Sequence, residues 1–337
     1  MKRILILLLL FVLLGGGTAW YLNNKPSGKM ATLTEERLFH VEDTGQIQKI
    51  FLADRKGNTT TLVRQGAKWL YNGKHLARQN VVHNLLQAIH RIRIRYIPSD
   101  AAVPNVVSTM AAEGIKVEIY GRGDKKINTY YVGGMTNDEM GTYMMREGYE
   151  NPFVMHIPNW QGGLRARYEV KGDDWRDRGV LRESIDNIES VSVEYPKQKN
   201  QSFVLSATDG DYSVKPFYEV TPAINRPLKK GRMEAFLYSL ENVQAEGYKN
   251  KSTKKDSVSA LVPFMKMTIK RKDGESKTIN FHPIIPYDSE GNLLTDDRVA
   301  TQTAVERYHV STSEGDFLVG QHRNFEKAFW GYPQFFD

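Results

Sequence analysis

The same succession of predicted elements occurs twice in this chain. A strand, a turn, a second strand ending in an aromatic residue, an amphipathic helix and further hairpins begin at Ile47, and a similar order begins again at Ile188. Three pairs of segments correspond, starting at Ile47 and Ile188, at Ile115 and Met265, and at Tyr143 and Tyr308. A repeat fixes architecture before any single motif does, so we expect two tandem domains of one duplicated fold. The alternative is two unrelated β-rich domains that share common hairpin patterns.

The predicted fold class is α+β. Apolar residues at positions 82, 85, 86 and 89 have the i, i+3, i+4, i+7 spacing of a helix that lies on a sheet, and residues 233–240 supply its counterpart. One main helix against several antiparallel strands is expected in each domain. We place the first domain at 45–170, an interdomain connection at 171–187 and the second domain at 188–337.

The N-terminus predicts a membrane anchor over residues 1–23. Ile4–Leu22 are uncharged and largely apolar, long enough to cross a hydrocarbon core of about 30 Å. Lys2 and Arg3 precede the run, which favours a cytoplasmic N-terminus and a single pass through the inner membrane, with the bulk in the periplasm. Residues 24–44 then form a linker. The alternative is a cleaved signal peptide, because Gly17, Thr18 and Ala19 resemble a cleavage site.

Composition excludes several classes of site. The 337 residues contain no cysteine, so a disulfide framework, a thiolate metal site and a lipid-modified cysteine are excluded. The net charge of +7 predicts attraction to anionic surfaces such as lipid headgroups or acidic glycans. Nucleic acid is not expected as a partner of an exported domain. The alternative explanation of the charge is solubility alone.

Candidate contact residues lie in three places. Arg91, Arg93 and Arg95 alternate with apolar residues, so a strand would present three guanidiniums on one face, either for anions or as a solvated face that discourages edge pairing. Trp175 lies among Arg176, Arg178 and neighbouring acidic residues, and we expect it to pack between the domains, with ligand stacking as the alternative.

The C-terminal tail is the third place, because residues 325–336 hold six aromatic side chains, including Trp330. These rings either close the second core or form an apolar patch for a partner or a membrane surface.

No catalytic, cofactor-binding or metal-binding residues are predicted. His83 and His90 lack the spacing of a zinc motif, no phosphate-binding glycine loop precedes a helix, and no Gly-x-Ser-x-Gly elbow occurs. Adjacent carboxylates such as Asp173 and Asp174 are typical of solvated loops. A non-enzyme is therefore expected, although an active site assembled from distant residues would escape this search.

Four short motifs occur along the chain: the Ile-x-Lys-Ile-Phe-Leu strand from Ile47, paired leucines at 85–86, Tyr-Val-Gly-Gly at 131–134 and Trp-Arg-Asp at 175–177. These motifs give the sequence a resemblance to an uncharacterised family, DUF4340. The resemblance implies a membrane-anchored periplasmic protein similar to auxiliary components of gliding-motility-type ABC transport systems, with no catalytic residues to carry over.

Three functions follow as hypotheses. The first is a non-catalytic accessory or scaffold protein of an envelope complex, with an envelope protein as its partner. The second is a binding module for acidic glycan or peptidoglycan that uses the arginines, and the third is an envelope hydrolase.

Overall fold

The computed structural model describes residues 39–170, 172–208, 211–285 and 305–336. The chain divides into two compact units between Asp177 and Arg178, a position inside the predicted connection. The predicted anchor, residues 1–23, and most of the predicted linker lie outside the described residues. Among the helices that are described, none is long and apolar enough to cross a membrane.

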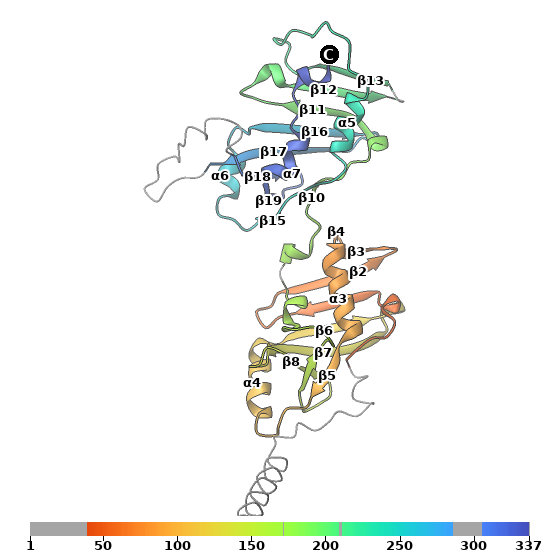
Figure 1. The fold of residues 1–337 in the computed structure, drawn as a ribbon, viewed down its shortest axis with the longest axis vertical. Helices are drawn as coiled ribbons and strands as arrows, with labels where there is room; N and C mark the ends of the chain where they lie inside the picture. Colours follow the sequence, from red (N-terminus) through yellow and green to blue (C-terminus); the bar gives the residue numbers. More distant parts are fainter. Residues whose placement is uncertain (1–38, 171, 209–210, 286–304, 337) are drawn as a thin grey trace, which may run out of the picture. The chain divides into compact units, whose positions relative to one another are not determined.

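The first unit is a nine-stranded antiparallel sheet with two helices (Figure 1). The order across the sheet is β4-β3-β2-β1-β6-β7-β8-β9-β5. Its strands are β1 (Lys49–Ala53), β2 (Thr59–Gln65), β3 (Lys68–Tyr71), β4 (His75–Leu76), β5 (Arg93–Tyr96), β6 (Ile115–Tyr120), β7 (Lys126–Met135), β8 (Thr142–Arg146) and β9 (Phe153–His156). Its helices are α3 (Gln79–Arg91) and α4 (Val103–Glu113).

Helix α3 is the predicted amphipathic helix, and it lies across one face of the sheet (Figure 1). Val82, Leu85, Ala88 and Ile89 are buried, which confirms the helical spacing read from the sequence. The helix ends before Ile92, whose backbone is extended and whose N–H donates to the carbonyl of Ala88.

Helix α4 was not predicted. Pro104 stands in its first turn, where a missing N–H costs nothing, and Met110 is buried over Gly133 of β7. A β-carbon on Gly133 would stand 2.8 Å from the Cγ of Met110, so this contact requires glycine. Val132, the neighbour of Gly133, belongs to the core under α3, so α4 covers the opposite face of the sheet.

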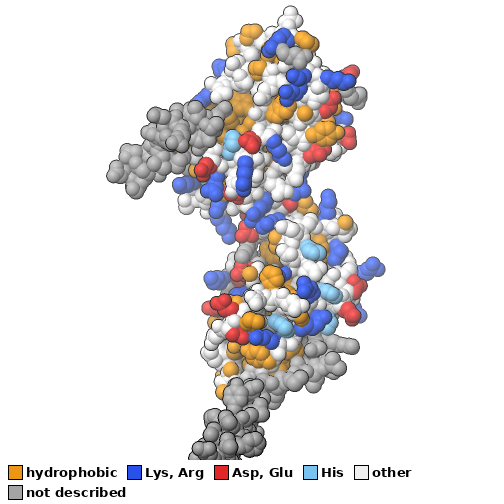
Figure 2. Space-filling view, viewed as in Figure 1, with side chains coloured by type: hydrophobic (Ala, Val, Ile, Leu, Met, Phe, Trp, Pro, Cys, Tyr) orange, Lys and Arg blue, Asp and Glu red, His pale blue; other side chains and the backbone are white. Residues whose placement is uncertain are grey.

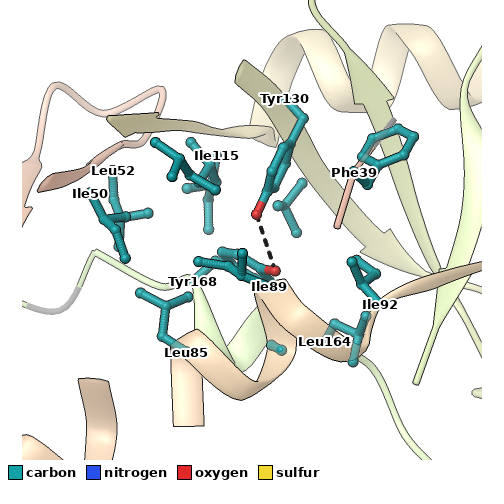
Figure 3. Close-up of a cluster of buried hydrophobic side chains, with 14 of the residues drawn as sticks. Phe39, Ile50, Leu52, Leu85, Ile89, Ile92, Ile115, Tyr130, Leu164 and Tyr168 are labelled. Atoms are coloured by element: carbon teal, nitrogen blue, oxygen red, sulfur yellow. Dashed lines mark hydrogen bonds between the residues drawn. The ribbon is translucent and has the colours of Figure 1, made fainter. Parts of the chain in front are cut away.

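The core under α3 is closed by aromatic rings. Tyr130 and Tyr168 are fully buried and share a hydrogen bond, and Phe39 packs against Tyr130 with ring centroids 5.7 Å apart (Figure 3). Phe39 and Val41 are core residues within the predicted 24–44 linker, so that part of the linker belongs to the folded unit, because it carries two apolar side chains that the sheet buries.

The second unit is an eight-stranded antiparallel sheet with an additional two-stranded sheet, β10-β14. Its strands are β10 (Gly179–Leu181), β11 (Ile188–Glu194), β12 (Phe203–Thr208), β13 (Asp211–Pro216), β14 (Val243–Gln244), β15 (Gly247–Tyr248), β16 (Met265–Arg271), β17 (Ser276–Ile284), β18 (Arg307–Thr312) and β19 (Phe317–Gln321). Its helices are α5 (Arg232–Ser239), α6 (Lys255–Ser259) and α7 (His322–Phe325).

The two units share one topology. The second sheet has the order β13-β12-β11-β16-β17-β18-β19-β15, which repeats the order β3-β2-β1-β6-β7-β8-β9-β5 of the first. The helices also occur in corresponding places along the chain: α3 corresponds to α5, and α4 corresponds to α6. All three pairs of segments that were matched from the sequence form corresponding strands, β1 with β11, β6 with β16 and β8 with β18. The predicted antiparallel, β-rich architecture is confirmed, but the described residues contain more helices than the one expected in each unit: α4 is additional in the first unit, and α6 and α7 are additional in the second.

The aromatic tail closes the second core. Phe325, Tyr332 and Phe335 are almost completely buried, and Trp330 packs against the same cluster while remaining partly exposed. Of the two interpretations of the tail, the structure supports core closure.

Candidate functional site

The predicted row of three arginines does not form in the structure. Arg91 is the last residue of α3, and only Arg93 and Arg95 lie in β5. The prediction of one continuous strand from Arg91 to Tyr96 is therefore wrong at its start, because the amphipathic pattern of α3 extends to the residue before Ile92.

Both strand arginines contact groups of their own unit. The Arg93 guanidinium donates to the carbonyls of His90 and Ile92, at 3.1 and 2.8 Å, which satisfies acceptors at the end of α3. Arg95 forms an ion pair with Asp138 at 2.7 Å. Hydrogen bonds from the Thr136 hydroxyl, the Met140 N–H and Arg95 lower the pKa of Asp138 to about 2. These two guanidiniums are engaged in the fold.

The residues around Trp175 are structural as well. Trp175 is 3% exposed in the core of the first unit, where its indole N–H donates to the carbonyl of Glu169. This position differs from the predicted one between the domains. Arg176 is buried and lies 3.4 Å from Asp173. In the second unit, the carbonyl of Arg178 accepts from the N–H of Ala245.

The second unit contains a cavity of about 470 Å³, within the usual size range of small-molecule sites. Strand ends and the C-terminal tail build it: Tyr195 follows β11, Phe264 precedes β16, Tyr308 lies in β18, and His322 begins α7. The lining residues are Tyr195, Gln198, Gln201, Phe264, Tyr308, His322, Glu326, Phe329, Gly331 and Gln334. We take this cavity as the candidate functional site and call it the aromatic cavity.

Four aromatic side chains form one wall of the aromatic cavity. The ring centroid of Phe264 lies 5.5 Å from that of Tyr195, 6.0 Å from that of Tyr308 and 5.6 Å from that of Phe329. Tyr195 and Tyr308 are buried, whereas Phe264 and Phe329 are partly exposed. The Tyr195 hydroxyl donates to the carbonyl of Trp330 at 3.0 Å, so Trp330 is the predicted contact residue that supports this site.

Three glutamines, Gln198, Gln201 and Gln334, line the aromatic cavity. Gln334 accepts a hydrogen bond from the N–H of Gly331 at 2.9 Å, and the Gln201 amide packs so closely on Gly331 that a β-carbon there would overlap with it. In the described part of the chain, Gln198 and Gln201 have no side-chain hydrogen bond. Primary amides both donate and accept, so these two offer both functions to a ligand.

One titratable pair borders the cavity. His322 shares a hydrogen bond with the Tyr308 hydroxyl at 3.3 Å, and its Nε2 lies 3.4 Å from the carboxylate of Glu326. Burial raises the pKa of Tyr308 to about 12, so its hydroxyl stays neutral. As far as the structure describes the lining, it holds a single carboxylate and no serine, threonine or cysteine. A nucleophilic triad needs a nucleophile such as serine, threonine or cysteine, and a glycosidase needs two carboxylates. The described lining supplies neither, so the arrangement suits binding.

The first unit has a cavity at the corresponding place. Lys116 and Lys266 are the second residues of the corresponding strands β6 and β16, and they pair with Ala53 and Glu194. Asp54 and Tyr195, which follow Ala53 and Glu194, therefore occupy corresponding positions in the two units. Asp54, Arg55, Lys56, Ala112, Glu113, Ile115, Arg165, Glu169 and Val170 line the first cavity.

Two polar side chains of that first cavity are committed to the fold. The Asp54 carboxylate accepts from the N–H groups of Lys56 and Asn58. Arg165 donates to the carbonyls of Val132, Gly133 and Glu113. Among the described lining residues, glutamine amides occur in the cavity of the second unit and not in that of the first.

On the viewed face of each unit, lysine and arginine side chains are intermixed with acidic ones (Figure 2), so no broad anion-binding patch stands out on that face. The aromatic cavity was not predicted from the sequence because its residues come from four separate segments; the aromatic tail was the one hint.

Comparison with models of protein families gave a match. Residues 107–260 match the family model described as a domain of unknown function, DUF4340, and no curated protein matches the chain. The match starts within α4 and ends beside α6, its counterpart in the second unit. It therefore covers about one period of the repeat and crosses the division between the units. The family resemblance seen in the sequence is confirmed: residues 107–260 of this chain are a match to the uncharacterised DUF4340 family.

Proposed function

We propose that this chain is a non-catalytic, membrane-anchored accessory protein of an envelope complex, such as one built around an ABC-type transporter. In this proposal, Ile4–Leu22 hold the protein in the inner membrane, with the N-terminus in the cytoplasm and both units in the periplasm. The two units then act as docking surfaces for a protein partner.

One observation carries the proposal. Leu261 and Val262, between α6 and β16, are 61% and 64% exposed. Large apolar side chains that stand together in water are typical of interaction sites. The residues of the first unit at the same distance before β6 are Ala111 and Ala112, in the last turn of α4, so the pair of large apolar side chains is specific to the second unit.

The chemistry of the described residues supports a role without catalysis. Among them, no group of three histidine, cysteine, aspartate or glutamate side chains is arranged to hold a metal ion. The aromatic cavity lacks a nucleophile and a second carboxylate. These features give the hydrolase alternative no support, and the engaged Arg93 and Arg95 give none to glycan binding through the arginine row.

Affinity purification of the full chain from native membranes in mild detergent tests the proposal. We expect a membrane protein to co-purify, and we expect replacement of Leu261 and Val262 by alanine, the residues of the first unit, to reduce its yield. Val220→Ala is the matched control, because Val220 is also strongly exposed in the second unit. Recovery of the chain without any partner would count against the proposal.

A further inference from the structure

We propose that the aromatic cavity binds an uncharged saccharide that carries acetamido groups. This inference goes beyond the docking role above and does not depend on it, because it concerns a small ligand and a different set of residues.

The charge of the lining favours an uncharged ligand. Among the described residues, no lysine or arginine lines the aromatic cavity, and the one carboxylate there, on Glu326, lies 3.4 Å from His322. A charged ligand would lose hydration there without gaining a dedicated counter-charge. The acidic glycan expected from the net charge is therefore disfavoured at this site.

The amide groups favour a ligand that both donates and accepts hydrogen bonds. Gln198 and Gln201 have no side-chain partner in the described chain, and Gln201 is held in place against Gly331. Hydroxyl and acetamido groups complement primary amides in both directions. A hydrocarbon ligand would cover the partly buried Gln201 amide without offering it a hydrogen-bond partner, which is unfavourable.

The aromatic rings favour the apolar faces of sugars. Phe264 and Phe329 are partly exposed at the aromatic cavity, with centroids 5.6 Å apart. A pyranose ring presents C–H groups on its faces and hydroxyls at its rim, and an acetamido group adds a methyl. Such a ligand places apolar surface on the rings and polar groups on the amides. The volume of about 470 Å³ leaves room for a sugar of this size.

Calorimetric titration of the full chain tests the proposal. The chain is kept in a polyoxyethylene detergent, because a sugar-based detergent would compete. The probe is the trimer of N-acetylglucosamine, compared with cellotriose, with the deacetylated cationic trimer and with an anionic uronic acid trimer. We expect the acetylated trimer to bind at least tenfold more tightly than each of the others.

Two variants locate the binding. Gln198→Leu removes one exposed amide and should weaken binding about tenfold, the equivalent of about 1.4 kcal/mol. Gly331→Ala should displace the Gln201 amide into the cavity and weaken binding by a similar factor. Gln65→Leu, an exposed glutamine of the first unit, is the matched control and should leave affinity unchanged.

Three results would overturn the proposal. They are the absence of binding by the wild-type chain, equal binding of cellotriose or of a charged trimer, and unchanged affinity in both cavity variants. Because Gln198 is exposed, its replacement leaves the core intact, and an unchanged melting temperature verifies this. Loss of the protein partner would leave the titration unaffected, so the two proposals fail separately.

Discussion

The hydroxyl groups of Tyr130 and Tyr168 lie 3.3 Å apart, and both side chains are fully buried in the first unit (Figure 3). Tyr130 donates this hydrogen bond. Burial raises the pKa of Tyr168 to about 12 and that of Tyr130 well above its usual value. Both hydroxyls therefore stay neutral across the physiological range, and the pair joins β7 to the segment that follows β9.

A double-mutant cycle measures this pair. Tyr130→Phe and Tyr168→Phe should each lower the free energy of unfolding of the first unit by about 1–2 kcal/mol, because each leaves a buried hydroxyl without its partner. The double variant should lose less than the sum of the two. Denaturant unfolding with local hydrogen exchange measures all four proteins, and strict additivity would show that the hydroxyls do not interact.

Arg93 should matter for the stability of α3. Arg93→Met keeps an apolar stem but removes the hydrogen bonds to the carbonyls of His90 and Ile92. We expect a loss of about 1 kcal/mol, concentrated in exchange protection of the last turn of α3. Arg91→Met is the matched control and should change stability by less than about 0.5 kcal/mol, because that side chain is exposed. Equal effects of the two would contradict the capping role.

Glu183 and Arg271 form a two-pronged ion pair in the second unit. Both guanidinium-to-carboxylate distances are 2.8 Å, and the Glu183 side chain is 5% exposed. Glu183→Gln should destabilise the second unit by about 2 kcal/mol, because it weakens a mostly buried, charge-assisted contact. Glu275→Gln removes the exposed partner of the same arginine and should cost less than about 1 kcal/mol. Thermal unfolding compares the variants, and a larger loss for Glu275→Gln would be inconsistent with the structure.

The second unit should lose stability in mild acid. His282 is 3% exposed, faces His309 across β17 and β18, and has no hydrogen-bond partner for either ring nitrogen in the described chain. Burial, followed by the charge of His309, lowers the pKa of His282. Burial and the nearby Lys254 and Lys249 lower that of His309.

The direction of the pH effect follows from these shifts. Because the folded pKa lies below the unfolded value of about 6.5, the folded unit binds fewer protons. The contribution is complete above about pH 6.5 and is lost as the pH falls through the folded pKa, by at most about 1.4 kcal/mol per pH unit for each group. His282→Gln should flatten the change in melting temperature between pH 7.5 and 5, whereas the exposed His83→Gln should not. Parallel curves for wild type and His282→Gln would refute this assignment.

The repeat was predictable because strands have a local sequence pattern. Alternating apolar residues around turns identified β6 and β16 as equivalent strands, and the spacing from Val82 to Ile89 located α3. Helix α4 was not predicted because its first turn combines β-branched residues with proline and has no helical stripe of leucines. The residues of this turn are Val103-Pro104-Asn105-Val106. Its fit depends on Gly133, which no local pattern links to it.

Side-chain partners were far less predictable than elements. The Arg93 guanidinium contacts main-chain carbonyls, and Trp175 is buried in the core of the first unit. Tertiary packing determines both side-chain positions, so the local sequence did not predict them. The aromatic cavity joins Tyr195, Phe264 and His322, which are far apart in the sequence. Only the folded chain brings them together.

Photo-crosslinking in the native envelope tests the docking role most directly. A photoreactive residue at position 261 or 262 should yield one dominant adduct with a membrane protein, and the same residue at position 111 or 112, the corresponding sites of the first unit, should not. Adducts that are absent at 261 and 262, or identical at all four positions, would contradict the proposal that this protein is an accessory subunit of an envelope complex.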